Sequence, residues 1–166
     1  MLTFRCTERV IQRFRLLIVR QVPSSTGRLG DWYANLLHVG PARFVLCQSA
    51  RSLLPIILPA RTSAFPGQFG LALGTVLRSL GIREALIAQE LESLKDVAFA
   101  RTASRQILGA MNDFADMARR YLIEEASSQA PGLRVCLKLA TMPSKPIGYE
   151  APCQLTAALF EAGKPS

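Results

Sequence analysis

The segment 31–58, DWYANLLHVGPARFVLCQSARSLLPIIL, decides the fold class of this chain. Apolar and polar residues alternate over 33–39, a Gly40-Pro41 turn follows, and further apolar stretches occupy 44–47 and 53–58. A period of two is the spacing of a half-buried strand and differs from the period of a helix. The segment therefore predicts three strands joined by short turns in an antiparallel meander, and it excludes an all-α fold.

Shorter elements are expected on both sides of this meander. Pro55 places the third strand at an edge of the sheet, because proline has no N–H to donate to a neighbouring strand. The longest apolar stripe at helical spacing runs over 105–125, with Thr102 or Ser104 as its cap. The other expected elements are strands at 2–6, 97–101 and 133–139, a helical turn after Thr7, and helices at 65–80, 84–94 and 154–162.

The 166 residues suit one compact domain spanning 1–166, because a single core of this size is stable and no linker interrupts the pattern. The fold predicted is α+β. It consists of an antiparallel sheet of four to six strands, packed on one face by three or four helices. The helix at 105–125 is expected to be central.

Composition excludes several classes of protein. The mean hydropathy is +0.21, but no apolar stretch reaches the roughly 18 residues of a membrane span, and no export signal is visible. A cytoplasmic protein without membrane contact is expected. The four cysteines are far apart and His38 is the only histidine. We therefore expect no metal site, no cofactor and no catalytic triad.

The positive charge is unevenly distributed. Residues 1–82 hold ten Arg and no Lys against Glu8 and Asp31, whereas residues 83–166 hold ten basic and ten acidic residues. The net charge of +8 therefore belongs to the first half. This asymmetry favours a surface for nucleic acid or an acidic protein. The alternative is a set of solvated arginines scattered over several faces, because they occur singly.

Several motifs together resemble those of a bacterial family whose members are named plasmid-related proteins or a domain of unknown function. The motifs are FRCTERV at 4–10, LGDWYANLL at 29–37, RSLLPIILPA at 51–60, MNDFA at 111–115 and MPSKPIGYEAP at 142–152. The resemblance covers nearly the whole chain. It implies a shared fold and a modest link to mobile DNA or toxin–antitoxin roles, but no activity, cofactor or catalytic residue.

Two polar residues, Asn112 and Asp113, interrupt the longest helix. Their short side chains compete for backbone groups and make them poor helix formers. In one interpretation they project into a pocket, with Arg101 or Arg105 as an anion contact. In the other, Asn112 hydrogen-bonds the loop 142–152 and docks it on the helix.

Aromatic and amide side chains supply the remaining candidates. Trp32 and Asn35 would stack on a base and hydrogen-bond it if the sheet bound a single strand. Trp32 alternatively belongs to the core, since one face of its strand must be buried. Tyr149 precedes the last helix, where backbone amides can bind an anion; its alternative is a tyrosine packed under the loop.

Three hypotheses for function remain open from the sequence. The first is a non-enzymatic binding protein of a mobile element that contacts nucleic acid or an acidic protein through its arginines. The second is a toxin-like enzyme acting on RNA or nucleotides without histidine chemistry. The third is a structural docking domain, for which a homodimer is one arrangement.

Overall fold

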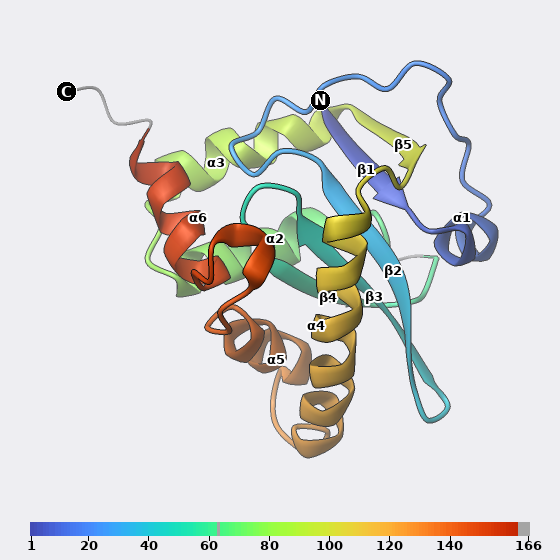
Figure 1. Cartoon of the computed structure of the whole chain (residues 1–166), viewed down its shortest axis with the longest axis vertical. Helices are drawn as coiled ribbons and strands as arrows, with labels where there is room; N and C mark the ends of the chain where they lie inside the picture. Colours follow the sequence, from blue (N-terminus) through green and yellow to red (C-terminus); the bar gives the residue numbers. More distant parts are fainter. Residues whose placement is uncertain (63, 163–166) are drawn as a thin grey trace.

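A computed structural model of the protein describes residues 1–62 and 64–162 (Figure 1). The strands are β1 (Leu2–Cys6), β2 (Trp32–Val39), β3 (Ala42–Ser49), β4 (Pro55–Pro59) and β5 (Val97–Arg101). The helices are α1 (Glu8–Phe14), α2 (Phe69–Ser79), α3 (Glu84–Glu92), α4 (Arg105–Glu124), α5 (Pro131–Leu139) and α6 (Pro152–Glu161). Short 3-10 helices occupy Ser93–Lys95 and Lys145–Ile147. The prediction of an α+β domain with four to six strands is confirmed.

The strands form one five-stranded sheet in the order β4-β3-β2-β1-β5. The antiparallel meander β2–β3–β4 is confirmed, but β1 runs parallel to both β2 and β5. The sheet is therefore mixed, and not antiparallel throughout. The physical reason is the long connection after β1, since a chain that leaves a strand through a helix can return beside it in the same direction.

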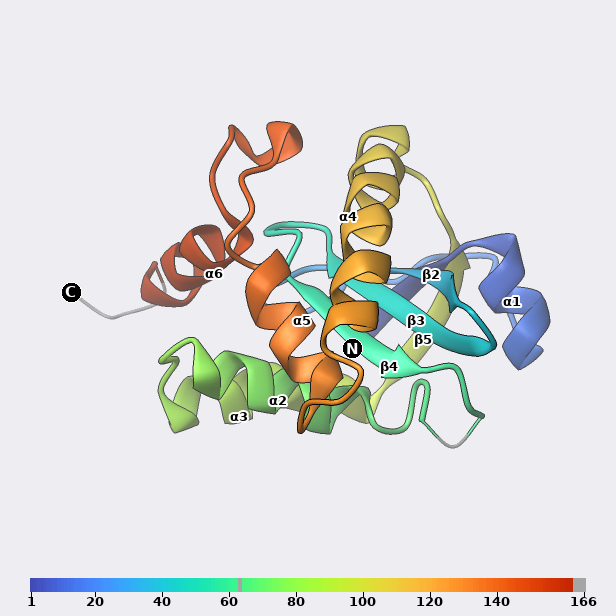
Figure 2. The same cartoon turned by 90° about the horizontal axis from the view of Figure 1, so that it is seen from below.

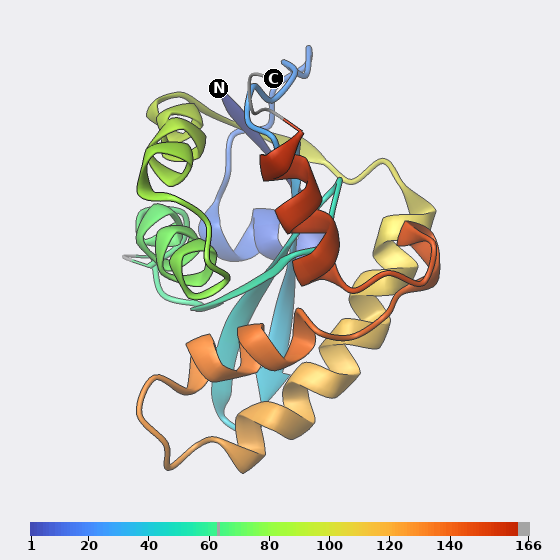
Figure 3. The same cartoon turned by 90° about the vertical axis from the view of Figure 1, so that its left-hand side faces the viewer.

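Helices cover both faces of the sheet, and not one face as expected (Figure 3). On one face Phe69 of α2 packs edge-on against Phe4 and Trp32, each with ring centroids 4.9 Å apart. On the other face the Tyr33 hydroxyl accepts a hydrogen bond from the Ser104 amide, where α4 begins. Strand β2 is buried on both sides along most of its length, and such a strand needs a helical layer on each face.

The edge strand β4 carries its prolines on its outer side. The Ala60 amide donates to Arg43 O (2.9 Å), so by the antiparallel alternation the backbone groups of Ile56 and Leu58 bond to β3, and those of Ile57 are directed away from β3. Pro55 and Pro59 share that outward side and have no N–H. The prediction of an edge position for Pro55 is confirmed, and the edge offers few donors to an added strand.

The expected strand at 133–139 is wrong, because these residues form α5. Its buried residues Val135, Cys136 and Leu139 lie on one helical face, and Pro131 occupies the first turn, where a missing N–H costs nothing. A short apolar run fits the period of a strand as well as the period of a helix, so periodicity alone does not distinguish a strand from a helix here. The helix at 105–125 is confirmed as α4, and the Ser104 hydroxyl caps it by accepting from the Ile107 amide.

All four cysteines are free thiols. Cys6, Cys47 and Cys136 are buried, and Cys153 is half-buried. Burial raises the pKa of Cys6 and of Cys136 to about 12. These thiols are therefore protonated and poorly nucleophilic at neutral pH.

Candidate nucleic-acid interface

The arginines of residues 1–82 differ in their contacts. One group has a carboxylate or amide partner: Arg5 pairs with Asp31 at 2.8 Å, Arg78 pairs with Glu84, and Arg28 donates to the Gln89 side chain at 3.1 Å. Arg15, Arg20 and Arg51 are exposed at separate places on the surface. The second group is Arg9, Arg13, Arg43 and Arg61, all exposed as well. Within residues 1–62 and 64–162, these four form no ion pair with a carboxylate.

Helix α1 directs two members of the second group toward the β2–β3 hairpin. Arg9 and Arg13 are four residues apart and therefore share one face of the helix. An Arg9 guanidinium nitrogen lies 3.0 Å from Nε2 of His38, and Arg13 donates to the Ala60 carbonyl at 3.0 Å. These contacts hold α1 against β2 and against the end of β4.

Arg13, Arg43 and Arg61 line one groove of about 480 Å³, here called the basic groove. Arg13 comes from α1, Arg43 from β3 and Arg61 from the segment after β4. The remaining lining residues are Pro41, Ala42, Phe44, Pro59 and Ala60, so the rest of the lining is apolar and contains no carboxylate. The hairpin and α1 lie on the side of the molecule opposite α6 (Figure 2).

His38 lies beside these arginines and is exposed. Desolvation lowers its pKa first, and the positive charges of Arg9, Arg43 and Arg119 lower it further. The imidazole is therefore mostly neutral at pH 7, and its Nε2 can accept the hydrogen bond from Arg9. The pKa of His38 therefore reports the positive potential around the β2–β3 hairpin.

Two candidate residues of β2 have structural partners. Trp32 is fully buried against Phe69, so its ring is unavailable to a base. The Asn35 Oδ1 accepts hydrogen bonds from the Thr7 hydroxyl at 3.0 Å and from the Leu36 amide at 2.8 Å. Asn35 thus holds the start of α1 against β2.

The candidates on and near α4 do not gather at one place. Arg105 and Asp113 line a pocket of about 300 Å³ between α4 and residues 142–146, together with Lys145. Asn112 is exposed and lies outside that lining. Arg101 pairs with Glu8 at the start of α1. Arg101, Arg105, Asn112 and Asp113 therefore do not come together as one catalytic group.

The loop 142–152 makes its hydrogen bonds locally. The Ser144 amide donates to Glu150 O at 3.1 Å, and the Tyr149 amide donates to Ser144 O at 2.9 Å. In the part of the chain that the structure describes, Asn112 makes no hydrogen bond to this loop. Tyr149 is 70% exposed, with φ +63°, so it does not pack beneath the loop.

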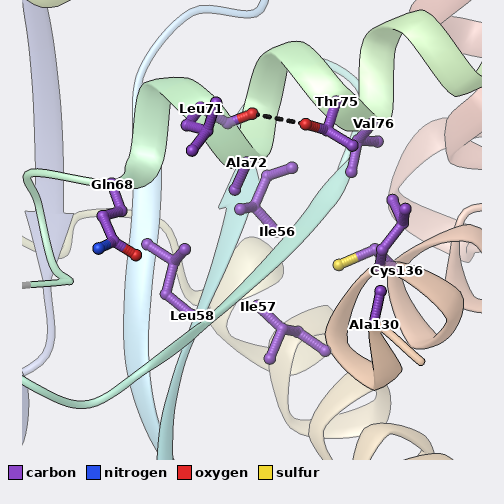
Figure 4. A pocket seen from close by; sticks show the side chains of 11 residues that line it. Ile56, Ile57, Leu58, Gln68, Leu71, Ala72, Thr75, Val76, Ala130 and Cys136 are labelled. Atoms are coloured by element: carbon purple, nitrogen blue, oxygen red, sulfur yellow. Dashed lines mark hydrogen bonds between the residues drawn. The ribbon is translucent and has the colours of Figure 1, made fainter. Parts of the chain in front are cut away.

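An apolar pocket of about 250 Å³ lies between α2, β4 and α5 (Figure 4). Ile56, Leu58, Val76 and Cys136 are among its lining residues. The Thr75 hydroxyl donates to Leu71 O within the same helix at 2.9 Å. This pocket therefore presents mainly hydrocarbon and no charged group.

Neither a metal site nor a membrane-spanning helix finds support among the described residues. No group of three or more His, Cys, Asp or Glu side chains there is arranged to hold a metal ion. No helix in the same residues combines the length and the hydropathy that crossing a membrane requires.

The basic groove was missed as a site by sequence reasoning, although the charge asymmetry pointed to its arginines. Arg13, Arg43 and Arg61 lie far apart in the sequence, and no local pattern indicates that they line one groove.

A family model described as Domain of unknown function (DUF6933) matches residues 3–155. No curated protein and no solved structure matches the chain. The family match confirms that the resemblance to a domain of unknown function extends over most of the chain. The link to plasmids stays a prediction.

Proposed function

Because the chain belongs to the DUF6933 family, whose function is unknown, we propose a function from its site: a non-enzymatic protein that binds nucleic acid through the basic groove. One observation carries the proposal. Arginines from three separate elements line one groove that has no carboxylate in its lining.

Phosphate is the chemical group that this arrangement suits best. A guanidinium presents planar, paired donors that match phosphate oxygens, and it stays charged at every physiological pH. Arg9 adds a further cation beside His38. Since Arg13 is tethered by one nitrogen to Ala60 O, its other N–H groups remain available for a phosphate.

The salt dependence of binding tests the proposal. Fluorescence anisotropy of a labelled oligonucleotide is measured over a salt series for the wild type and for the Arg43→Ala/Arg61→Ala double variant. Each lost phosphate contact should lower the slope of log K against log salt by about 1. Arg20→Ala/Arg83→Ala is the matched control, because it removes the same number of charges from two exposed positions outside the groove.

Two results would overturn the proposal. One is the absence of binding at low salt. The other is equal loss of affinity in the groove variant and in the Arg20→Ala/Arg83→Ala control, which would mean that total charge, and no particular surface, attracts the oligonucleotide. Retention of an acidic protein by the same arginines, without oligonucleotide binding, would assign the groove to a protein partner.

A role on a mobile element is a second part of the proposal. The motif resemblance to plasmid-related proteins supports it, and the charge asymmetry is consistent with it. The identity of the neighbouring reading frames tests it. Relaxase, toxin or restriction genes beside this one would support the role, and consistent placement among metabolic genes would contradict it.

A further inference from the structure

We propose that the pocket between α4 and residues 142–146 binds a small linear zwitterion, with a carboxylate at one end, an ammonium group at the other and a hydrocarbon chain between them. This site is separate from the basic groove and goes beyond the proposed function. The observation behind it is that Arg105, Lys145 and Asp113 line one pocket of about 300 Å³. Within residues 1–62 and 64–162, none of these three side chains forms an ion pair.

The opposite charges on the α4 wall are too far apart to neutralise each other. Arg105 and Asp113 are eight positions apart on the helix, which is a rise of about 12 Å along its axis. Ion pairs within a helix form between residues three or four positions apart, as between Asp116 and Arg119 at 2.9 Å. Arg105 and Asp113 therefore both keep the capacity to pair with a ligand that reaches from one to the other.

Gly109 lies between these two charges and leaves the wall open. A glycine inside a helix destabilises it relative to alanine. Among the described residues, a Cβ on Gly109 would meet nothing within 4 Å, so the packing of the protein does not require glycine at this position. The missing side chain instead gives a ligand access to the helix surface between Arg105 and Asp113.

The facing wall supplies a second cation. Lys145 is the first residue of the short 3-10 helix that lies beside α4 (Figure 3). Hydrogen bonds within the loop hold this wall in place, since the Gly148 amide donates to Lys145 O at 3.0 Å and the Ser144 amide donates to Glu150 O at 3.1 Å. A wall that is already ordered loses little conformational entropy when a ligand binds.

The charges and the apolar lining together specify the ligand. A carboxylate accepts paired hydrogen bonds from a guanidinium such as that of Arg105, and Lys145 adds a further positive charge. A plain anion would leave Asp113 unpaired, whereas an ammonium group at its other end would donate to that carboxylate. Apart from Gln106 and Ser144, the uncharged residues of the lining are apolar. A hydrocarbon chain therefore suits the middle of the ligand better than a polar linker does.

An NMR titration of the full chain tests the inference with 6-aminohexanoate, hexanoate and hexylamine. The amide signals of residues 105–113 and 144–146 should shift in a saturable manner with 6-aminohexanoate. Hexanoate and hexylamine each lack one of the two charges. Each should bind at least about tenfold more weakly, the equivalent of about 1.4 kcal/mol for one charged hydrogen bond.

Substitutions on α4 make the test specific. Asp113→Asn should weaken 6-aminohexanoate binding at least about tenfold and should not weaken hexanoate binding. Glu124→Gln is the matched control, because Glu124 is exposed on the same helix outside the pocket. Gly109→Leu should raise the melting temperature, since leucine is the better helix former and meets open space. Its side chain occupies the pocket, however, so binding should be lost without a loss of fold.

The outcomes separate this inference from the proposed function. The absence of saturable shifts, equal affinity for hexanoate and 6-aminohexanoate, or binding that persists in Gly109→Leu would each overturn the inference. Weaker binding in Asp113→Asn and Gly109→Leu, with Glu124→Gln unaffected, would support it. The Arg43→Ala/Arg61→Ala double variant should bind 6-aminohexanoate as the wild type does, so failure at either site leaves the other proposal standing.

Discussion

The two ends of strand β2 use the same residue type in different ways. Before its first residue, Asp31 pairs with Arg5, and the nearby Arg51 donates to the Arg28 carbonyl at 3.1 Å. Beyond its last residues, around the hairpin, Arg43 has no carboxylate partner among the described residues. We call the first region the anchored end and the second the basic end. The comparison shows that the positions of a few acidic residues, more than the number of arginines, decide which surface can attract an anion.

A buried glutamate shows how acidic groups are used at the anchored end. Glu90 of α3 is 2% exposed, and its two carboxylate oxygens accept hydrogen bonds from the Arg28 amide at 2.7 Å and the Leu29 amide at 3.1 Å. The approach is so close that a Cβ on Gly27 would lie 2.4 Å from Oε1 of Glu90. The Glu90 carboxylate therefore fixes the loop at residues 27–29 to α3, and its buried charge is not available to a ligand.

The largest expected effect concerns this glutamate. Glu90→Gln replaces one acceptor oxygen by an amide donor facing backbone N–H groups, and it should lower the free energy of unfolding by about 2–3 kcal/mol. Gly27→Ala should also destabilise, because its methyl group displaces the carboxylate. Urea denaturation measures both. Oligonucleotide binding at the basic end should persist in the folded variants.

Glu92→Gln is the matched control for Glu90→Gln. Glu92 pairs with Lys95 on the surface, with its side chain 63% exposed, and exposed pairs of this kind contribute little. Its substitution should change the free energy of unfolding by less than about 0.5 kcal/mol. Equal effects at the two positions would remove the distinction between a buried carboxylate and an exposed one.

A smaller effect is expected at the Arg5–Asp31 pair. Asp31 accepts hydrogen bonds from Arg5 at 2.8 Å and from the Ser25 hydroxyl at 2.6 Å. Asp31→Asn should therefore cost about 1–2 kcal/mol in urea denaturation. Arg43→Ala at the basic end should cost less than about 0.5 kcal/mol, because no ion pair is lost. The reverse order would show that the basic end is structural and would weaken its assignment to binding.

The middle of α4 provides a third point of comparison. Asn112 and Asp113 are both exposed there, and the described residues give Asn112 no hydrogen bond to the loop 142–152. Asn112→Ala and Asp113→Ala should each raise the free energy of unfolding by up to about 0.5 kcal/mol, since alanine is the better helix former. Thermal melts measure the change. A destabilised Asn112→Ala would instead indicate a docking contact.

Local patterns predicted the elements of this fold better than their arrangement. The alternation over 33–39 identified β2 because successive side chains point to opposite faces. The direction of β1 depended on the route of the chain between Cys6 and Trp32, which periodicity does not describe. The short run 133–139 satisfied two periods, and its burial against β4 and α4 selected the helix.

The candidate site was predictable only as a charge excess. The count of arginines identified the half of the chain that carries the charge, but Arg5 meets Asp31 across 26 positions in sequence. Glu90 likewise reaches residues 28 and 29 across more than 60 positions. Such distant pairings decide which cations remain free, and they arise from the fold.

The smallest expected effect reports directly on the basic end and needs no substitution. His38 is the only histidine, so its imidazole signals in an NMR titration are unambiguous. Desolvation, followed by the charges of Arg9, Arg43 and Arg119, lowers its pKa from the ordinary value of 6.5. A phosphate bound among these arginines offsets their charge, so a saturating oligonucleotide should raise the pKa of His38.

The signs of the linked effects follow from this shift. In the free protein the unfolded state binds the His38 proton more readily, so stability should fall slightly as pH drops below 6.5 and should recover as pH rises. If nucleic acid raises the pKa of His38, the protonated form binds more tightly, and affinity should increase as pH falls through the same interval. Arg43→Ala should raise the pKa in the absence of ligand, whereas Arg83→Ala should leave it unchanged. A His38 pKa that stays constant at saturating oligonucleotide would place the bound phosphates away from the basic end, even if the protein binds nucleic acid elsewhere.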